Sequence, residues 1–299
     1  MSRYRAILAA GLLVAALGGV TACHRNPSYP VQATYAKAGP YATTTGTVTD
    51  AAGKAIYDEY YPANYAALPF KSPIVTWGNG TGGKPANTAV FFRHLASYGF
   101  TIIATTLSNT GGGAEIDAAA RYLISRASMP GSVFYGHLDT SEVAAVGLSQ
   151  GATGAVRAAT IDPSLYKTVM TFSLPNKIWS NPNSDCPTKA DCTPDPAVLI
   201  QPIFFISTHG PFDAVIASPA TERAYFCSTA VHAALGIILL TEGRLADHPS
   251  IGPDPGGFLG YATAWLEYQL RGNSFAARAF TGRHPELLRN PNWPGSAVK

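Results

Sequence analysis

The segment from Ser141 to Thr160 constrains the fold most strongly, because it joins a short apolar run, a glycine-flanked serine and an alanine-rich stretch. Val143–Val146 is long enough for a buried strand and too short for a helix. The pentapeptide GLSQG, Gly147–Gly151, follows directly, and Ala152–Thr160 is predicted to be helical. Strand, G-x-S-x-G and helix, in this order, are the context that a nucleophile elbow requires.

The spacing of the two glycines in this motif has a steric explanation. A serine on a tight strand-to-helix turn has a strained backbone, and bulky residues two positions away would clash, which Gly147 and Gly151 avoid. The turn would lift the Ser149 hydroxyl out of the sheet, and the helix that follows would present its amide end to a developing negative charge. The alternative is a glycine-rich helix start in a doubly wound nucleotide-binding domain.

Residues 1–23 are predicted to be an export signal. Two arginines precede an apolar segment, Ala6–Val20, that is too short and too rich in glycine and alanine for a transmembrane helix. Val20–Cys23 looks like a bacterial lipobox, in which Cys23 is diacylated and becomes the mature N-terminus. Two acyl chains would anchor the protein stably to the outer face of the membrane. The alternative is an ordinary signal peptide in which Cys23 is incidental.

The remainder is predicted to comprise a flexible tether, residues 24–40, and a single α/β domain, residues 41–299. Strand-like and helix-like segments alternate, which predicts a mostly parallel sheet with helices on both faces. The first two strand segments are expected to form an antiparallel hairpin. The predicted strands are Thr44–Asp50, Ala55–Tyr61, Pro73–Trp77, Phe100–Thr106, Val143–Val146, Val169–Leu174, Ile203–Ser207 and Ala233–Thr241. The predicted helices are Asn87–Tyr98, Ala114–Ser128, Ala152–Thr160, Pro219–Cys227 and Gly257–Gln269.

The charge of the chain argues against a nucleic-acid partner, and its cysteines indicate a disulfide instead of a metal site. The formal net charge is only +3, which gives no electrostatic reason to expect nucleic acid. In an oxidising compartment, Cys186 and Cys192 are the favoured disulfide pair, although either of them could instead pair with Cys227. The spacing of these cysteines, without nearby histidines, is a poor zinc signal, so no metal is expected.

His248 is the favoured base for a serine nucleophile, which needs a base and a group that orients it. In folds built around a nucleophile elbow, the acid and then the histidine follow the serine along the chain. His248 lies in a polar loop between the last predicted strand and the closing helix, where it can reach over the sheet. His209 is a weaker candidate, His232 lies among apolar residues, and His284 lies in the tail.

Asp213 is the favoured acid, because it follows the predicted strand Ile203–Ser207 in a strand-end loop before the histidine. The alternative role for Asp213 is a helix cap or a turn. Asp247 adjoins His248 on the chain and is therefore badly placed to bond its Nδ1 atom. The other aspartates of this region lie in the predicted disulfide loop and compete poorly: Asp185, Asp191 and Asp195.

Two backbone amides are expected to stabilise an oxyanion. One belongs to Gln150, which follows the nucleophile, and the other comes from the glycine-rich loop after the strand Pro73–Trp77. Within that loop Thr81 is favoured, with Asn79 and Gly80 as alternatives. A phosphate cradle is the competing interpretation, but the loop lacks the Lys-Ser/Thr ending of a P-loop.

With these parts in place, the chain resembles the α/β-hydrolase superfamily. Within it the chain is most similar to bacterial cutinase-like polyester hydrolases and their dienelactone-hydrolase-like relatives. The resemblance implies an α/β-hydrolase fold and a carboxylic-ester hydrolase that needs no cofactor and uses Ser149, Asp213 and His248. It is carried by His94–Thr106, Asp139–Ala159, Asp213, His248 and Ala264–Leu270.

The chain departs from the polyester hydrolases around the nucleophile. They usually have a His-Met pair flanking the serine, where this chain has Leu148 and Gln150, and an aromatic residue in the loop that is NGTGG here. The resemblance therefore does not extend to the side-chain clamp for an aromatic polyester. Trp179 falls near the position of a substrate-contacting tryptophan, with core packing as the alternative. Dienelactone hydrolases use cysteine, so Ser149 argues against that reaction.

These observations together predict an exported, lipid-anchored serine esterase that acts on an ester substrate as a monomer. One alternative is an acyltransferase that uses the same triad and passes the acyl group to a wall or lipid acceptor. The other is a catalytically inactive hydrolase-fold lipoprotein that binds a ligand.

Overall fold

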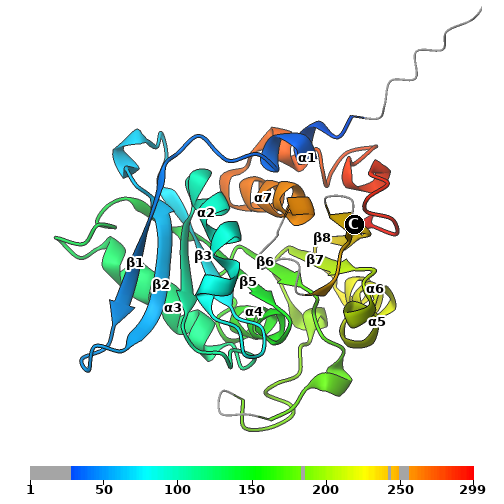
Figure 1. The fold of residues 1–299 in the computed structure, drawn as a ribbon, viewed down its shortest axis with the longest axis horizontal. Coiled ribbons are helices and arrows are strands. Elements are labelled where there is room, and N and C mark those ends of the chain that lie inside the picture. Colours follow the sequence, from blue (N-terminus) through cyan, green and yellow to red (C-terminus); the bar gives the residue numbers. More distant parts are fainter. Residues whose placement is uncertain (1–27, 183–185, 242–243, 249–255) are drawn as a thin grey trace, which may run out of the picture.

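The described residues of this computed structural model, 28–182, 186–241, 244–248 and 256–299, include one nine-stranded sheet (Figure 1). The pairings of β4 with β3, β3 with β5, and onward to β8 are parallel. The pairings of β1 with β2, β2 with β4 and β8 with β11 are antiparallel. The predicted α/β class with a mostly parallel sheet is thus confirmed. In spatial order the strands are β1 (Thr43–Thr49), β2 (Ala55–Pro62), β4 (Thr101–Thr105), β3 (Ser72–Gly78), β5 (Leu138–Leu148), β6 (Thr168–Phe172), β7 (Ile203–Thr208), β8 (Ala233–Ile238) and β11 (Ala297–Val298).

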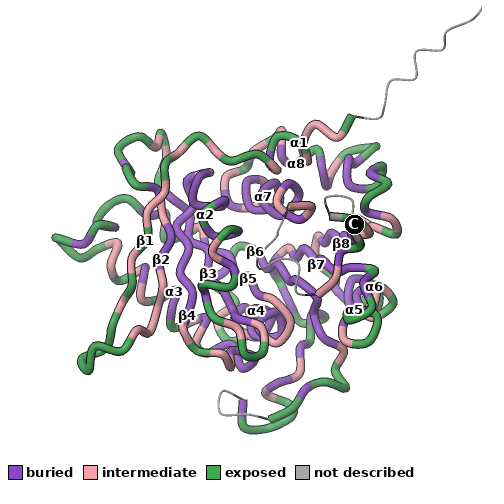
Figure 2. Tube along the Cα trace, in the orientation of Figure 1, coloured by how far each residue is buried: buried purple, intermediate pink, exposed green. Residues whose placement is uncertain are grey.

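Helices cover both faces of the sheet, because successive side chains of its central strands point to opposite sides and most are apolar. On β3, for example, Val75 and Trp77 belong to one core and Ile74 to the other. The first core also contains residues of α1 (Pro30–Tyr35), α2 (Ala89–Ser97), α7 (Gly256–Arg271) and α8 (Ser274–Ala277). The second contains residues of α3 (Ala114–Ala127), α4 (Gln150–Ile161) and α6 (Pro219–Ser228). Figure 2 shows the buried central strands between these layers.

The predicted hairpin forms at one edge of the sheet, where Thr44 faces Tyr61 in the antiparallel register of β1 and β2. Other predicted elements differ from the observed ones mainly at their ends. The predicted strand Ala233–Thr241 is broken, since β8 stops at Ile238 and the chain then pairs Leu240–Thr241 (β9) with Arg244–Leu245 (β10). The loop predicted after β7 contains a short helix, α5 (Pro211–Ile216).

The prediction of a flexible tether over residues 24–40 is wrong for its described part. Residues 30–35 form α1, in which Val31 and Tyr35 are 0% and 5% exposed. The carboxylate of Glu286 accepts hydrogen bonds from the backbone amides of Val31, at 2.9 Å, and Gln32, at 2.8 Å. Two interactions hold α1 against the domain. Its two apolar side chains are buried, and the Glu286 carboxylate binds amides at the helix start that have no partner within the helix.

The predicted export signal, its lipidation residue Cys23 and residues 24–27 lie outside the described residues. Within the described ranges, no helix combines the length and the apolar character needed to span a membrane.

Candidate active site

Ser149 occupies a strained turn between β5 and α4, with φ of 57° and ψ of −122°. Residues other than glycine rarely adopt a positive φ, and such strain is concentrated at functional sites. The turn is held by the backbone, because the Ser149 amide donates to the Phe172 carbonyl at 2.8 Å, and the Ser149 carbonyl accepts from Ala152 at 2.8 Å. This is the geometry that the G-x-S-x-G segment predicted.

The two glycines of the motif are required by close backbone approaches. A Cβ atom on Gly147 would lie 2.0 Å from the Gly151 carbonyl oxygen, and one on Gly151 would lie 2.0 Å from the Gly78 carbonyl oxygen. No side chain fits at such distances. Helix α4 can therefore begin directly against the ends of β3 and β5, and the expected steric reason for both glycines is confirmed.

The structure brings Asp213 and His248 into direct contact, although they are 35 residues apart in the chain. The Nδ1 atom of His248 lies 2.7 Å from the Oδ1 atom of Asp213, whose side chain is 0% exposed. A carboxylate can only accept, so Nδ1 donates the proton of this bond, and in the neutral form of the ring Nε2 is an acceptor. Asp213 lies within α5, whose cap is Gly210, so the alternative of a helix cap does not apply.

The second oxygen of Asp213 is held by several donors from β7 and from the end of β6. Its Oδ2 atom accepts from the Thr208 amide at 3.0 Å, the Thr208 hydroxyl at 2.7 Å and the Ser173 hydroxyl at 2.8 Å. Ser173 itself has a positive φ of 52°. These bonds fix the carboxylate plane and offset the cost of burying its charge.

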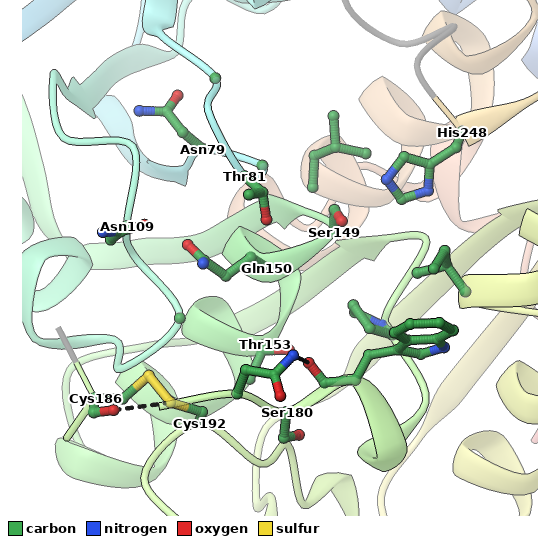
Figure 3. Close-up of a pocket in the computed structure, with 18 of the residues that line it drawn as sticks. Asn79, Thr81, Asn109, Ser149, Gln150, Thr153, Ser180, Cys186, Cys192 and His248 are labelled. Carbon is green, nitrogen blue, oxygen red and sulfur yellow. Dashed lines mark hydrogen bonds between the residues drawn. A yellow bond between two sulfur atoms is a disulfide. The ribbon is translucent and has the colours of Figure 1, made fainter. Parts of the chain in front are cut away.

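Ser149 and His248 line one cavity of about 610 Å³, with Thr81, Trp179 and Phe212 (Figure 3). In Figure 3 the His248 ring and Ser149 face the same space. No hydrogen bond joins the two side chains within the described ranges, and in free hydrolases such bonds often close only when substrate is bound. The contact between His248 and Asp213 and the shared cavity with Ser149 are consistent with the predicted triad of these three residues.

The glycine-rich loop after β3 lies against the elbow. A Cβ atom on Gly80 would be 3.6 Å from the Cβ of Ser149, so the backbone at Gly80, next to Thr81, lies close to Ser149. Asn79 is buried, and its side-chain amide donates to the carbonyls of Thr105, at 2.6 Å, and Leu107, at 2.8 Å. Asn79 therefore braces the loop rather than offering its side chain to a ligand.

Gln150 presents its backbone amide and its side chain to different parts of the site. It is the first residue of α4, so its amide has no partner within the helix and is available to a ligand. Its side-chain oxygen accepts from the Thr110 amide at 2.9 Å, which fixes the loop on the far side of the cavity. The oxyanion role expected of the Gln150 amide stays a prediction, and the side-chain bond to Thr110 was not predicted.

The other candidate histidines, all within the described residues, do not line the cavity. His209 and His284 are exposed. His232 stacks on Trp265, with ring centroids 5.7 Å apart, and its Nδ1 atom lies 2.6 Å from the Lys299 carbonyl oxygen, as its apolar neighbours suggested.

Trp179 and the cysteine loop lie at the cavity rim. Trp179 is 42% exposed, so it is not a core residue, and its indole donates to the Val215 carbonyl at 3.2 Å. Cys186 and Cys192 form the disulfide favoured by the sequence and contribute to the lining, whereas Cys227 is free and exposed.

Phe212 is a lining residue that sequence reasoning missed. Its ring packs on the His248 ring, with centroids 4.7 Å apart, and it is half exposed. The available signal was its position beside Asp213, at the carboxyl end of a parallel strand. The described residues contain no group of three metal-ligating side chains.

Sheet, elbow and acid–histidine pair together define the α/β-hydrolase fold. A family model described as PET hydrolase-like (PETase) matches residues 20–188, more than half of the chain. The chain belongs to this PET hydrolase-like family, which confirms the resemblance to cutinase-like polyester hydrolases. The matched region contains Ser149 but neither Asp213 nor His248, so their pairing is supported by geometry alone.

Two cutinases are similar to this chain. "Cutinase" of Thermobifida fusca (strain YX) is 30% identical over 187 residues, 59% of this chain and 59% of that protein. "Cutinase 1" of Thermobifida cellulosilytica is 32% identical over 157 residues, 49% of this chain and 56% of that protein. The chain thus spans less than two thirds of the length of either relative.

Proposed function

We propose that this protein hydrolyses carboxylic esters through an acyl-enzyme. The observation that carries the proposal is the 2.7 Å contact between His248 and the buried Asp213, beside a cavity that also exposes Ser149 on a strained elbow. Membership of the PET hydrolase-like family and the similarity to two proteins named as cutinases support the same chemistry.

Each side chain of the triad has one task. Ser149 attacks the ester carbonyl carbon while Nε2 of His248 accepts the hydroxyl proton, and the alcohol leaves with that proton. Asp213 keeps the proton of the neutral imidazole on Nδ1 and stabilises the imidazolium that forms. Water then attacks the acyl-enzyme by the same path and releases the acid.

The negative charge on the carbonyl oxygen is held by two backbone amides. One is the amide of Gln150 at the start of α4, and the second comes from the loop that carries Thr81, whose neighbour Gly80 lies against Ser149. No metal or other cofactor is needed for these steps.

Trp179 and Phe212 provide an aromatic rim for the substrate. Both are substantially exposed, and both line the cavity beside the proposed base. We propose that they contact the apolar part of the ester, which makes hydrophobic esters the preferred substrates.

Replacement of Ser149 by alanine tests this function. We expect Ser149→Ala to lower the turnover of p-nitrophenyl butyrate by about 10,000-fold or more. The circular dichroism spectrum should stay that of the folded wild type. Ser141→Ala is the matched control, because Ser141 is an exposed serine of the same strand. Wild-type turnover in Ser149→Ala would refute the proposal, and product analysis with added alcohols separates hydrolysis from acyl transfer.

We also propose that the protein is exported and anchored to the outer face of the membrane through acylated Cys23. This proposal depends on the VTAC motif after an apolar segment. Cys23→Ala should move the protein from the membrane fraction to the soluble one and remove incorporation of labelled palmitate. Unchanged fractionation and labelling would contradict it.

A further inference from the structure

The carboxylate of Asp247 joins the two segments that carry the proposed acid and base. Its Oδ1 atom accepts from the backbone amide of His248 at 2.8 Å, of Phe212 at 3.1 Å and of Asp213 at 3.3 Å. Its Oδ2 atom lies 3.3 Å from the Phe212 amide. One side chain thus holds the main chain of the acid and of the base at the same time.

This arrangement differs from a direct role in the triad. The His248 ring bonds Asp213 through Nδ1, and the Asp247 bond to His248 is made to its backbone amide. Asp247 therefore holds the main chain from which the His248 side chain extends. The amides of Phe212 and Asp213 lie in the first turn of α5 and lack helical partners, so the carboxylate also satisfies two otherwise open donors.

Gly210 makes room for this carboxylate. A Cβ atom at Gly210 would lie 2.3 Å from Oδ1 of Asp247 and 2.4 Å from its Cγ atom. The glycine has an ordinary negative φ of −67°, so its backbone conformation does not require glycine. The space that Asp247 occupies is the reason for the residue at position 210.

We propose that Asp247 is a positioning residue that fixes the distance between Asp213 and His248, a claim that rests on the proposed esterase function. One side-chain oxygen accepts from three backbone amides, so it can hold the short segment Asp247–His248 against the start of α5. Without it the imidazole would keep its chemistry but lose its fixed place beside Asp213.

The test compares Asp247→Ala and Asp247→Asn in the full chain. Alanine removes all the bonds, whereas asparagine keeps an oxygen acceptor for them, as it does at helix starts. We expect Asp247→Ala to lower kcat by about 10- to 100-fold with KM changed less than about threefold. Asp247→Asn should regain most of the lost kcat.

A second measurement reports on the bond without activity. Proton NMR of the His248–Asp213 hydrogen bond should show a deshielded imidazole proton in the wild type that broadens or disappears in Asp247→Ala and returns in Asp247→Asn. Gly210→Ala, which leaves Asp247 in the chain but crowds its carboxylate, should resemble Asp247→Ala and serves if that variant does not fold.

The outcomes separate the two proposals. If the wild-type protein does not turn over esters at all, the proposed function itself is refuted. If the wild type is active and folded Asp247→Ala or Gly210→Ala has the same kcat and the same NMR signal as the wild type, the positioning role alone is overturned. Equal losses in Asp247→Ala and Asp247→Asn would also overturn it, because the retained acceptor would then have no effect.

Discussion

The proposed nucleophile and the proposed acid–base pair of this site are held in place by different interactions. Ser149 is positioned by backbone packing, since Gly147 and Gly151 leave no space for a side chain between α4 and the strands below it. Asp213 and His248 are positioned by polar side chains from the residue after β6, from β7 and from the segment before His248. One half of the site is steric and local, and the other is polar and assembled from distant parts of the chain.

This difference predicts which property each half controls. A change in the steric half forces backbone apart and should cost stability. A change in the polar half leaves the backbone packing in place and should cost mainly activity, because the loss of one buried hydrogen bond costs only about 1–3 kcal/mol of stability.

The largest expected effect is on activity, in Asp213→Asn. The amide would favour the wrong imidazole tautomer, so kcat should fall by about 10,000-fold while the protein stays folded. Steady-state kinetics and thermal unfolding measure the two quantities. Asp139→Asn, at a partly exposed aspartate on β5, is the matched control. A loss of less than tenfold in Asp213→Asn would show that the polar half does not orient the base.

The next effect is on stability, in Gly151→Ala. Its new Cβ atom would lie 2.0 Å from the Gly78 carbonyl oxygen, and we expect unfolding free energy to fall by about 3 kcal/mol or more. Urea denaturation measures this loss. Gly53→Ala is the control, since Gly53 has a positive φ of 79° but open space around it, so only the backbone cost of about 1 kcal/mol applies. Equal losses in the two variants would contradict a steric role.

The smallest effect concerns Glu222, a fully buried carboxyl group behind the acid. Its Oε1 atom accepts from the Leu174 amide at 2.7 Å, and its Oε2 atom has no partner among the described side chains. Burial, and then the neighbouring Asp213 carboxylate, raise the pKa of Glu222 well above its usual value. Its protonated form is thus favoured in the fold, and its contribution to stability is lost as pH rises through the raised pKa.

Glu222→Gln should therefore be more stable than the wild type at pH 9, by at least about 1 kcal/mol, with a smaller difference at pH 5. Its kcat should also decline less with pH, because no second charge forms beside Asp213. In Glu59→Gln, stability should rise similarly above pH 7, since burial raises the pKa of Glu59 to about 7, but the kcat profile should not change. If kcat depended on pH in the same way in both variants, the predicted electrostatic effect of Glu222 on Asp213 would be contradicted.

The steric half could be predicted from the sequence, and the polar half only in part. Val143–Val146 and the glycines around Ser149 carry local signals, so strand, elbow and helix were all foreseen. The order of acid and histidine, together with their predicted loops after two strands, favoured Asp213 and His248. Nothing local to Asp247 indicates that its carboxylate meets the Phe212 amide, because that contact exists only after the fold has formed.

The same limit explains the error at the N-terminal end of the domain. Proline, alanine and tyrosine around residues 30–35 suggested a tether, whereas Glu286 and the core next to α7 make this segment a docked helix. A helix of six residues is too short to be stable alone, so its formation depends on partners that lie far away in the sequence.

Covalent labelling with a fluorophosphonate tests most directly whether the two halves of the site work together at Ser149. Reaction of the intact protein followed by peptide mapping should find one adduct, on Ser149, formed much more slowly in Asp213→Asn and absent in Ser149→Ala. A folded wild-type protein that remains unlabelled at Ser149, or reacts there equally fast without the Asp213 carboxylate, would contradict a nucleophile activated by the acid–histidine pair.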